Sequence, residues 1–254
     1  MNNIPTASIE VVDFTSMYES WQNHQEVTPF CHWIKEEIAQ RGYAYIAHPI
    51  DQSCFEKICQ ELGTIESIAD LTVDQKRNAE QRKRRLEKGR GNRPSRFQST
   101  KFGFHTDVPI VGIMGFYCRI QDPTDGALQV IDVDHVVDYF SEAERALLET
   151  INFKWTIRQD GIETTFECPV LSPGKDHYRL YYAPWLAKDQ YREEEEALLK
   201  KFAQFVEEME RTQVKAIRTQ PKEALFVNNR RVLHGRGPLE EDSPRDILRV
   251  RLYA

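Results

Sequence analysis

The chain has 254 residues, of which 40% are hydrophobic, 29% charged and 11% aromatic, a composition typical of a globular protein with a sizeable core. Its formal net charge of −6 gives no general attraction to nucleic acid or to an anionic membrane, and no apolar run approaches the roughly 18 residues of a membrane span. The first residues lack a signal-peptide pattern and the five cysteines lack metal-type pairing, so we expect reduced thiols and a cytoplasmic location.

The N-terminal region predicts two helices on either side of a short strand. Apolar side chains recur at helical spacing over 28–40, and Gly42 is placed to end that helix. Residues 43–47 then alternate as a strand does, and 51–63 read as a second helix with an apolar stripe. A largely helical region therefore precedes the rest of the chain.

Residues 74–96 carry ten Lys or Arg against three acidic residues. The first half is predicted to be helical, and its GRGNRP end is predicted to be a loop. We favour a solvated, mobile connection over a basic lid that closes on an anionic ligand. A nucleic-acid arm ranks last, because the aromatic side chains that stack on bases are missing. We expect no nucleic-acid partner.

From Phe97 onward, strand-like runs separated by turns dominate. They cover 110–120, 127–133, 151–158, 162–172, 177–185, 224–238 and 245–254. Among them lie a capping box at Ser141 and Glu144 and an amphipathic helix over 191–213, whose apolar face carries Leu198, Phe202, Phe205 and Met209. Strands flanked by helices, rather than alternating with them, predict an α+β fold in which residues 1–254 form a single domain around a β-sandwich or jelly-roll core.

One polar pair needs a physical reason. His105 and Asp107 occupy alternate positions of KFGFHTDVP, so we expect both to project from one face of a strand. If that face is inward, the charge has to be paired or metal-bound. Two imidazoles and one carboxylate are the ligands of mononuclear Fe(II) oxygenases, which keep the opposite side of the metal open. The same set also suits zinc.

The third ligand has few candidates. The histidines of the helical N-terminal region, and those in loops or at strand edges, have no obvious partner. His234 ends an apolar run and is followed by Gly235, so its ring can lie at the mouth of a strand. For an isolated H-x-D pair a hydrogen-bonded structural histidine is the commoner explanation, and only the combination of motifs favours a metal site.

Four blocks resemble the taurine dioxygenase and clavaminate synthase-like family of Fe(II)- and 2-oxoglutarate-dependent oxygenases. RGYAYIAHPIDQSCFEKICQELGTI is similar to the opening of that family, FHTDVP to its H-x-D strand, NNRRVLHGRGP to the strand of its distal histidine, and RDILR to its R-x-x-x-R close. The resemblance covers most of the chain and implies a double-stranded β-helix (jelly-roll, cupin-like) core with flanking helices. It also implies that His105, Asp107 and His234 hold Fe(II), with 2-oxoglutarate and O2 as co-substrates.

The resemblance also assigns roles to the arginines. Arg245 is expected to bind the distal carboxylate of 2-oxoglutarate, because a guanidinium can hold a carboxylate through two hydrogen bonds. Arg249 shares its strand face and is expected to help the co-substrate or to bind an anionic group of the substrate. Arg251 has the same parity, and Arg236 is a weaker candidate for substrate contact. For these two, ion pairs with the acidic residues 240–242 are the favoured alternative.

Two further positions bear on the chemistry. Many relatives have a Thr that contacts 2-oxoglutarate where this chain reads DGALQVIDV, so Gln129 either replaces that donor or leaves the contact absent. Related halogenases have a small residue in place of the carboxylate. Asp107 therefore favours oxygen transfer, desaturation or cyclisation over halogenation.

We therefore expect a dioxygenase that hydroxylates an unactivated C–H bond of a small polar or anionic molecule, such as an amino acid or a natural-product intermediate, and releases succinate and CO2. The basic segment 74–96, Lys101 and Arg249 favour a substrate with a carboxylate or another anionic group. Desaturation or cyclisation at the same iron site, a zinc protein, and a non-enzymatic binding protein on the same scaffold are the alternatives.

Overall fold

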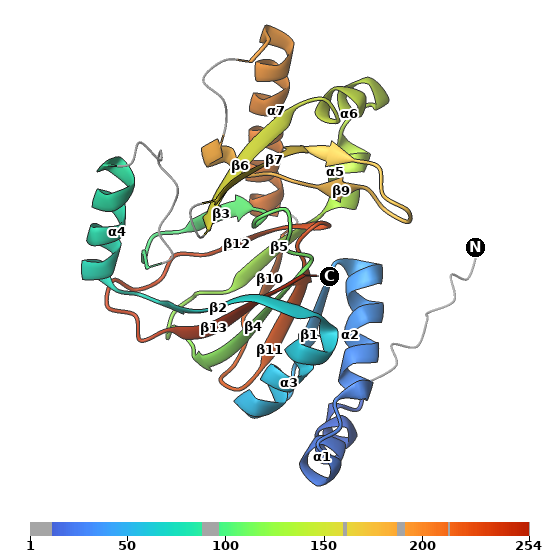
Figure 1. Cartoon of the computed structure of the whole chain (residues 1–254), viewed down its shortest axis with the longest axis vertical. Coiled ribbons are helices and arrows are strands. Elements are labelled where there is room, and N and C mark those ends of the chain that lie inside the picture. Colours follow the sequence, from blue (N-terminus) through green and yellow to red (C-terminus); the bar gives the residue numbers. More distant parts are fainter. Residues whose placement is uncertain (1–11, 88–96, 160–161, 187–190, 213, 254) are drawn as a thin grey trace.

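A computed structural model describes residues 12–87, 97–159, 162–186, 191–212 and 214–253 of the chain. Two antiparallel sheets lie at its centre (Figure 1). In spatial order, the larger sheet contains β1 (Tyr43–Ile46), β11 (Ala224–Asn228), β4 (Ile113–Ile120), β13 (Asp246–Tyr253) and β2 (Thr64–Thr72). The smaller sheet contains β10 (Lys215–Ile217), β5 (Leu128–Asp132), β12 (Val232–Arg236) and β3 (Phe102–His105). The expected α+β fold with a jelly-roll core is confirmed.

Helices and two short hairpins surround these sheets. The helices are α1 (Phe14–His24), α2 (Thr28–Arg41), α3 (Gln52–Leu62), α4 (Gln75–Glu87), α5 (Val133–Tyr139), α6 (Glu142–Leu148) and α7 (Glu193–Thr212), with a 3₁₀ turn η1 (Pro184–Leu186). The hairpins pair β6 (Asn152–Gln159) with β7 (Ile162–Pro169), and β8 (Leu171–Ser172) with β9 (Arg179–Leu180). Among the described residues, no helix has the length and apolar character that crossing a membrane requires.

The buried side chains form three layers. One cluster packs α1, α2 and α3 against the outer face of the larger sheet, and it includes Phe30, Ile58 and Phe226. A second lies between the two sheets, around Met114 and Val130. The third packs α5, α6 and α7 against the smaller sheet, and its members include Phe140, Phe202, Phe205 and Leu233. Helices on both outer faces therefore support the sheets and leave the space between them for a site.

Local sequence signals explain where several helices begin and end. Gly42 has φ 76°, and its N–H donates to the carbonyl of Ile38 at the end of α2. A Cβ at Gly42 would lie 2.3 Å from Cγ1 of Val232, so a side chain is excluded by both backbone and space. The capping box predicted at Ser141 and Glu144 is present at the start of α6.

The structure departs from the sequence predictions in several elements. Helix α1 and strand β2 were not predicted. The run around His234 is not one strand, because a turn over 229–231 divides it into β11 and β12, which belong to different sheets. In the run 177–185, only Arg179–Leu180 is a strand. The turn over 229–231 connects the two sheets and so brings the end of β11 next to the strand that carries His234.

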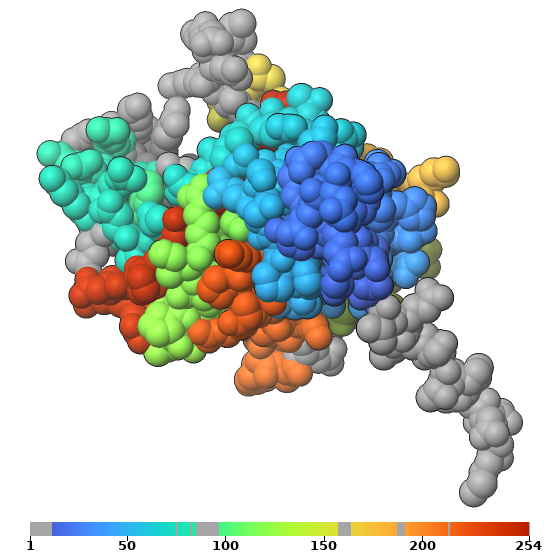
Figure 2. All heavy atoms as spheres, turned by 90° about the horizontal axis from the view of Figure 1, so that it is seen from below, coloured from blue at the N-terminus to red at the C-terminus, as the bar shows by residue number. Residues whose placement is uncertain are grey.

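The basic segment is helical in its first half, as predicted, and forms α4. In Figure 2, α4 lies at the left edge of the molecule, whereas α1 lies on the face in view, to the right of its centre. Its predicted loop end, including 88–96, lies outside the described residues.

Candidate metal centre

Two imidazoles lie side by side in the smaller sheet. β3 and β12 are antiparallel neighbours, and their register places His105 directly opposite His234. The ring centroids are 4.4 Å apart, and the residues are 6% and 5% exposed, respectively. The pairing of two strands that are distant in sequence thus brings together the two histidines that the sequence singled out.

Both imidazoles can act as neutral ligands. Nδ1 of His105 lies 2.9 Å from the backbone oxygen of Gly103, so it is the donor and the neutral ring has no proton on Nε2. Burial lowers the pKa of His234 to about 4, although the charge of Asp107 acts in the opposite direction. Nδ1 of His234 has no hydrogen-bond partner in the described part of the chain. These are the properties of nitrogen atoms available to a metal ion.

Asp107 lies just beyond the end of β3, not within it. The chain leaves the strand at Thr106, whose N–H donates to the carbonyl of Tyr182 at 2.8 Å and whose hydroxyl accepts from the N–H of Tyr182 at 3.0 Å. The N–H of Asp107 then donates to Oδ1 of Asn229 at 2.7 Å. Contrary to the sequence prediction, Asp107 is therefore not part of the strand, and hydrogen bonds to two other segments position it.

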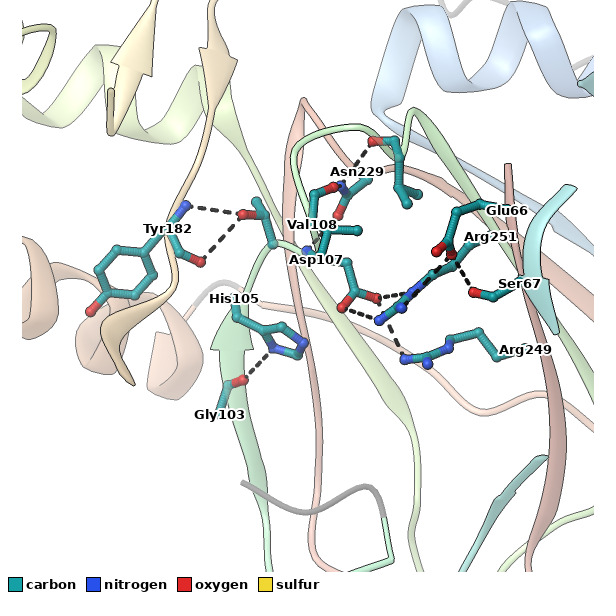
Figure 3. A network of polar contacts seen from close by, with 12 residues as sticks. Glu66, Ser67, Gly103, His105, Asp107, Val108, Tyr182, Asn229, Arg249 and Arg251 are labelled. Atoms are coloured by element: carbon teal, nitrogen blue, oxygen red, sulfur yellow. Dashed lines mark hydrogen bonds and ion pairs between the residues drawn. The ribbon is translucent and has the colours of Figure 1, made fainter. Parts of the chain in front are cut away.

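Two arginines of β13 contact the Asp107 carboxylate (Figure 3). Nη2 of Arg251 donates to Oδ1 at 2.6 Å and its Nε donates to Oδ2 at 3.1 Å, whereas Nη1 of Arg249 lies 3.5 Å from Oδ2. Burial would raise the pKa of Asp107, but the charges of Arg251 and Arg249 hold it well below its usual range. Asp107 is 1% exposed and is therefore an ionised carboxylate in the protein interior.

His105, Asp107 and His234 are the residue types that bind Fe(II), but in this structure their ligand atoms do not surround a common point. In the residues that the structure describes, no group of three or more His, Cys, Asp or Glu side chains is spaced to hold an ion. In this structure Arg251 engages both oxygens of Asp107. Metal binding therefore requires one carboxylate oxygen to turn or to be shared. Two neutral imidazoles and an ionised carboxylate are the facial ligands that Fe(II) oxygenases use.

A pocket adjoins the histidines. Its polar walls include His105, His234, Arg236, Arg245 and Arg249. The remaining wall is mostly apolar and includes Leu71, Phe102, Met114, Phe116, Leu128 and Leu239. The expected metal ligands of the two strands and the expected 2-oxoglutarate arginine thus face one space.

Arg245 is a buried cation with unused donors. It is 3% exposed, its Nε has no hydrogen-bond partner, and its guanidinium makes no ion pair with any described residue. Burial lowers its pKa to about 10, and the nearby charge of Arg236 acts in the same direction. Such a guanidinium can donate hydrogen bonds to a carboxylate that enters the pocket.

Arg236 lines the pocket but is already occupied. Its guanidinium donates to the backbone carbonyls of Gly237, Gln98 and Thr100. The favoured alternative for Arg236 and Arg251, ion pairs with the acidic residues 240–242, is wrong, because within the described residues neither makes such a pair. Arg236 holds backbone segments instead, and Arg251 holds Asp107.

Gln129 is not brought to the pocket. In the register of β5 and β12, Gln129 pairs with Gly235 and Val130 pairs with His234, so Gln129 lies on the face of the sheet opposite to the histidine. Its neighbour Leu128 lines the pocket instead. The contact that Gln129 was expected to make with 2-oxoglutarate therefore has no support in this arrangement.

Asn229 is a site residue that the sequence reading missed. Its Nδ2 donates to the carbonyls of Val108 at 3.3 Å and Val111 at 3.0 Å, while its Oδ1 accepts from Asp107. It is 1% exposed and ties the turn after β11 to the loop that carries the carboxylate. The available signal was a pair of Asn residues directly after an apolar strand, which is typical of a turn.

Comparisons with known proteins indicate a family and support the fold. Residues 18–251 match the family model of the taurine catabolism dioxygenase TauD, TfdA family. A solved structure of asparagine oxygenase with Fe(II), 2S,3S-3-hydroxyasparagine and succinate has a TM-score of 0.64 at 14% identity and covers 94% of this chain and 83% of that one. A structure of the non-heme iron oxygenase OrfP with Fe and alpha-ketoglutaric acid has a TM-score of 0.63 at 12% identity. The match covers 89% of this chain and 79% of that one.

Another similar structure, AAD-2 with Mn(II) and N-oxalylglycine, has a TM-score of 0.65 at 14% identity and covers 89% of each chain. The comparison with curated protein sequences found no match. The structural likeness supports the fold, and the family match extends over nearly the whole chain. This chain therefore belongs to the TauD/TfdA dioxygenase family, whose members are Fe(II)- and 2-oxoglutarate-dependent oxidoreductases.

Proposed function

We propose that this chain is a hydroxylase that holds Fe(II) with His105, Asp107 and His234, binds 2-oxoglutarate with Arg245, and oxidises a C–H bond of a small polar or anionic molecule. The observation that carries the proposal is the convergence of His105, His234 and Arg245 on one pocket. Bound Fe(II) supplies the activation of O2 at the expense of 2-oxoglutarate, which is released as succinate and CO2.

The residues of the chain divide the remaining work. Arg245 binds and orients the carboxylate of the co-substrate, since its buried guanidinium has free donors. The apolar wall around Met114, Phe116 and Leu128 excludes water from the reacting centre. His105 is held in one orientation by Gly103, and Asp107 by Asn229, so two of the metal ligands are positioned before any ligand enters.

The substrate is proposed to carry a carboxylate. Arg249 lines the pocket as a second cation besides Arg245, and its Nη1 lies 3.5 Å from Oδ2 of Asp107. The wall between the polar residues is mostly apolar, which suits a short side chain beyond the charged group. Similar structures hold hydroxylated asparagine and (3S)-hydroxy-L-Arg, so free amino acids are the first class to test.

Helix α4 is proposed to attract such anions to the pocket. Its described cationic side chains Lys76, Arg77, Lys83 and Arg84 are exposed. Because exposed cations raise the local concentration of an anionic ligand, they favour its encounter with the protein. Residues 1–254 are proposed to form one domain. The basic segment near 74–96 is proposed to act as a lid-like part of that domain.

The test is turnover of an amino-acid panel with Fe(II), 2-oxoglutarate and O2, followed by succinate formation and product mass. The proposal predicts succinate coupled to a product with one added oxygen atom, and loss of both in His234→Ala. Arg179→Met is a matched control, because Arg179 is exposed and does not line the pocket. Loss of two hydrogens without added oxygen would assign desaturation or cyclisation instead. Equal activity with Zn(II), or no coupled succinate with any substrate class, would contradict the proposal.

A further inference from the structure

Arg251 contacts Asp107 more closely than any other cation that the structure describes. Its Nη2 and Nε approach the two carboxylate oxygens at 2.6 Å and 3.1 Å, the forked geometry in which a guanidinium binds a carboxylate most strongly. Arg249 makes one approach at 3.5 Å, the outer limit for a hydrogen bond. Arg251 therefore makes the two-bond contact with Asp107, and Arg249 does not.

A second carboxylate anchors this guanidinium from the other side. Nη1 of Arg251 lies 3.9 Å from Oε2 of Glu66, on the neighbouring strand β2. Arg251 pairs in register with Ser67, whose hydroxyl donates to Glu66. All three nitrogens of the guanidinium thus face carboxylates, and its side chain is only 13% exposed. Arg251 is held in place and is not a mobile surface group.

We propose that Arg251 is a positioning residue for the metal-binding carboxylate: it keeps one oxygen of Asp107 while the other oxygen binds the metal. The proposal rests on the proposed function, because it takes Asp107 as a ligand. A carboxylate has about four lone-pair sites, so it can accept from a guanidinium and bind a metal at once. The oxygen to be retained is Oδ1, which has the shorter contact, and Oδ2 is the one to be released.

This arrangement has two consequences. Single-oxygen ligation leaves room at the metal for the co-substrate and O2, whereas two-oxygen ligation would fill one of those positions. The fork also fixes the orientation of a side chain that is attached to a loop and not to a strand. Because outer partners of metal ligands orient them, the loss of Arg251 is expected to weaken metal binding about 10- to 100-fold.

The experiment is an anaerobic titration of the metal-free full chain with Mn(II), without 2-oxoglutarate, in which electron paramagnetic resonance reports the free ion. Arg251→Met removes the fork and the charge, and Arg251→Lys removes the fork but keeps the charge. Arg179→Met is the control for loss of a cation, because Arg179 is exposed and does not line the pocket. Weaker binding in both Arg251 variants, and no weakening in Arg179→Met, is the expected result. The visible absorption of bound Co(II) is expected to change in the Arg251 variants, which a purely structural role of Arg251 would not cause.

The outcomes are separable. Equal or tighter Mn(II) binding by folded Arg251 variants would show that Arg251 competes with the metal, and would overturn the proposal. If Arg251→Met does not fold, Arg251→Lys decides the question, because it retains a positive charge beside buried Asp107. Binding by the wild type that is unchanged in His234→Ala would overturn the metal site of the proposed function itself, whatever the Arg251 variants do.

Discussion

Replacing Arg245 by Met should strongly weaken 2-oxoglutarate binding and stabilise the ligand-free protein at the same time. Arg245 is 3% exposed and has no carboxylate partner among the described residues. Each hydrogen bond to a charged group contributes about 1.5–3 kcal/mol. Loss of a two-bond contact with the co-substrate therefore corresponds to a decrease in affinity of roughly 10²- to 10⁴-fold.

The gain in stability follows from the pKa of the same side chain. Burial lowers that pKa from 12.5 to about 10, so folding disfavours the charged form by an amount on the order of 3 kcal/mol. This cost is fully present below the folded pKa and disappears as the pH rises from about 10 toward 12.5. Met has a similar length and no charge. The free energy of unfolding of Arg245→Met at neutral pH is therefore expected to rise by about 1–3 kcal/mol.

Two measurements check this prediction. Calorimetric titration of the metal-loaded protein with 2-oxoglutarate under anaerobic conditions gives the affinity, and guanidinium unfolding of the ligand-free protein gives the stability. Arg245→Lys is the control for charge: it keeps the cation, loses the fork, and should lie between the wild type and Arg245→Met in affinity. An Arg245→Met protein that is less stable and binds 2-oxoglutarate like the wild type would refute the reasoning.

Three further predictions concern the frame of the site. The pKa of His234 is lowered from 6.5 to about 4. The neutral His234 side chain therefore contributes its full stability above pH 6.5, and this contribution is lost as the pH falls toward 4. The free energy of unfolding of His234→Gln should vary less across this range than that of the wild type, by roughly 2–4 kcal/mol. Asn229→Ala leaves the N–H of Asp107 and two carbonyls without their partner, so chemical unfolding should show a loss of about 2–4 kcal/mol, together with weaker metal binding. Gly42→Ala forces a side chain into φ 76° and against Val232, and it should lower the melting temperature by several degrees, consistent with a loss of about 1–3 kcal/mol.

Each of these predictions has a clear contrary result. An unchanged pH profile in His234→Gln would mean that another group causes the pH dependence. Full stability of Asn229→Ala would mean that the loop of Asp107 is held by other contacts. A Gly42→Ala protein as stable as the wild type would contradict the close approach of α2 and β12.

The sequence allowed the proposed metal ligands to be named, but not the way in which the fold positions them. The H-x-D block, the distal histidine and Arg245 could be named because the residue types and their order are specific. The position of Asp107 could not be derived from a period of two, because β3 ends at His105 and the next residues are held by Tyr182 and Asn229.

The sequence also does not show which face of a sheet a given side chain lies on. Leu128 and Gln129 are adjacent, and only the register between β5 and β12 decides which of them faces the pocket. Likewise, the partner of Arg251 depends on which residue of another segment lies opposite, and here it is Asp107 and not a nearby acid in the sequence. The pairing of strands that are distant in sequence therefore decides which side chains face the pocket, and the local sequence pattern does not.

The central claim is that His105, Asp107 and His234 hold Fe(II) beside a 2-oxoglutarate site formed by Arg245. The most direct measurement is an anaerobic optical titration of the Fe(II)-loaded protein with 2-oxoglutarate. The wild type should develop a weak visible charge-transfer band that saturates. The band should be absent in His105→Ala and His234→Ala, and it should require far more 2-oxoglutarate in Arg245→Met. No band in the wild type, or an unchanged band in His234→Ala, would contradict the account.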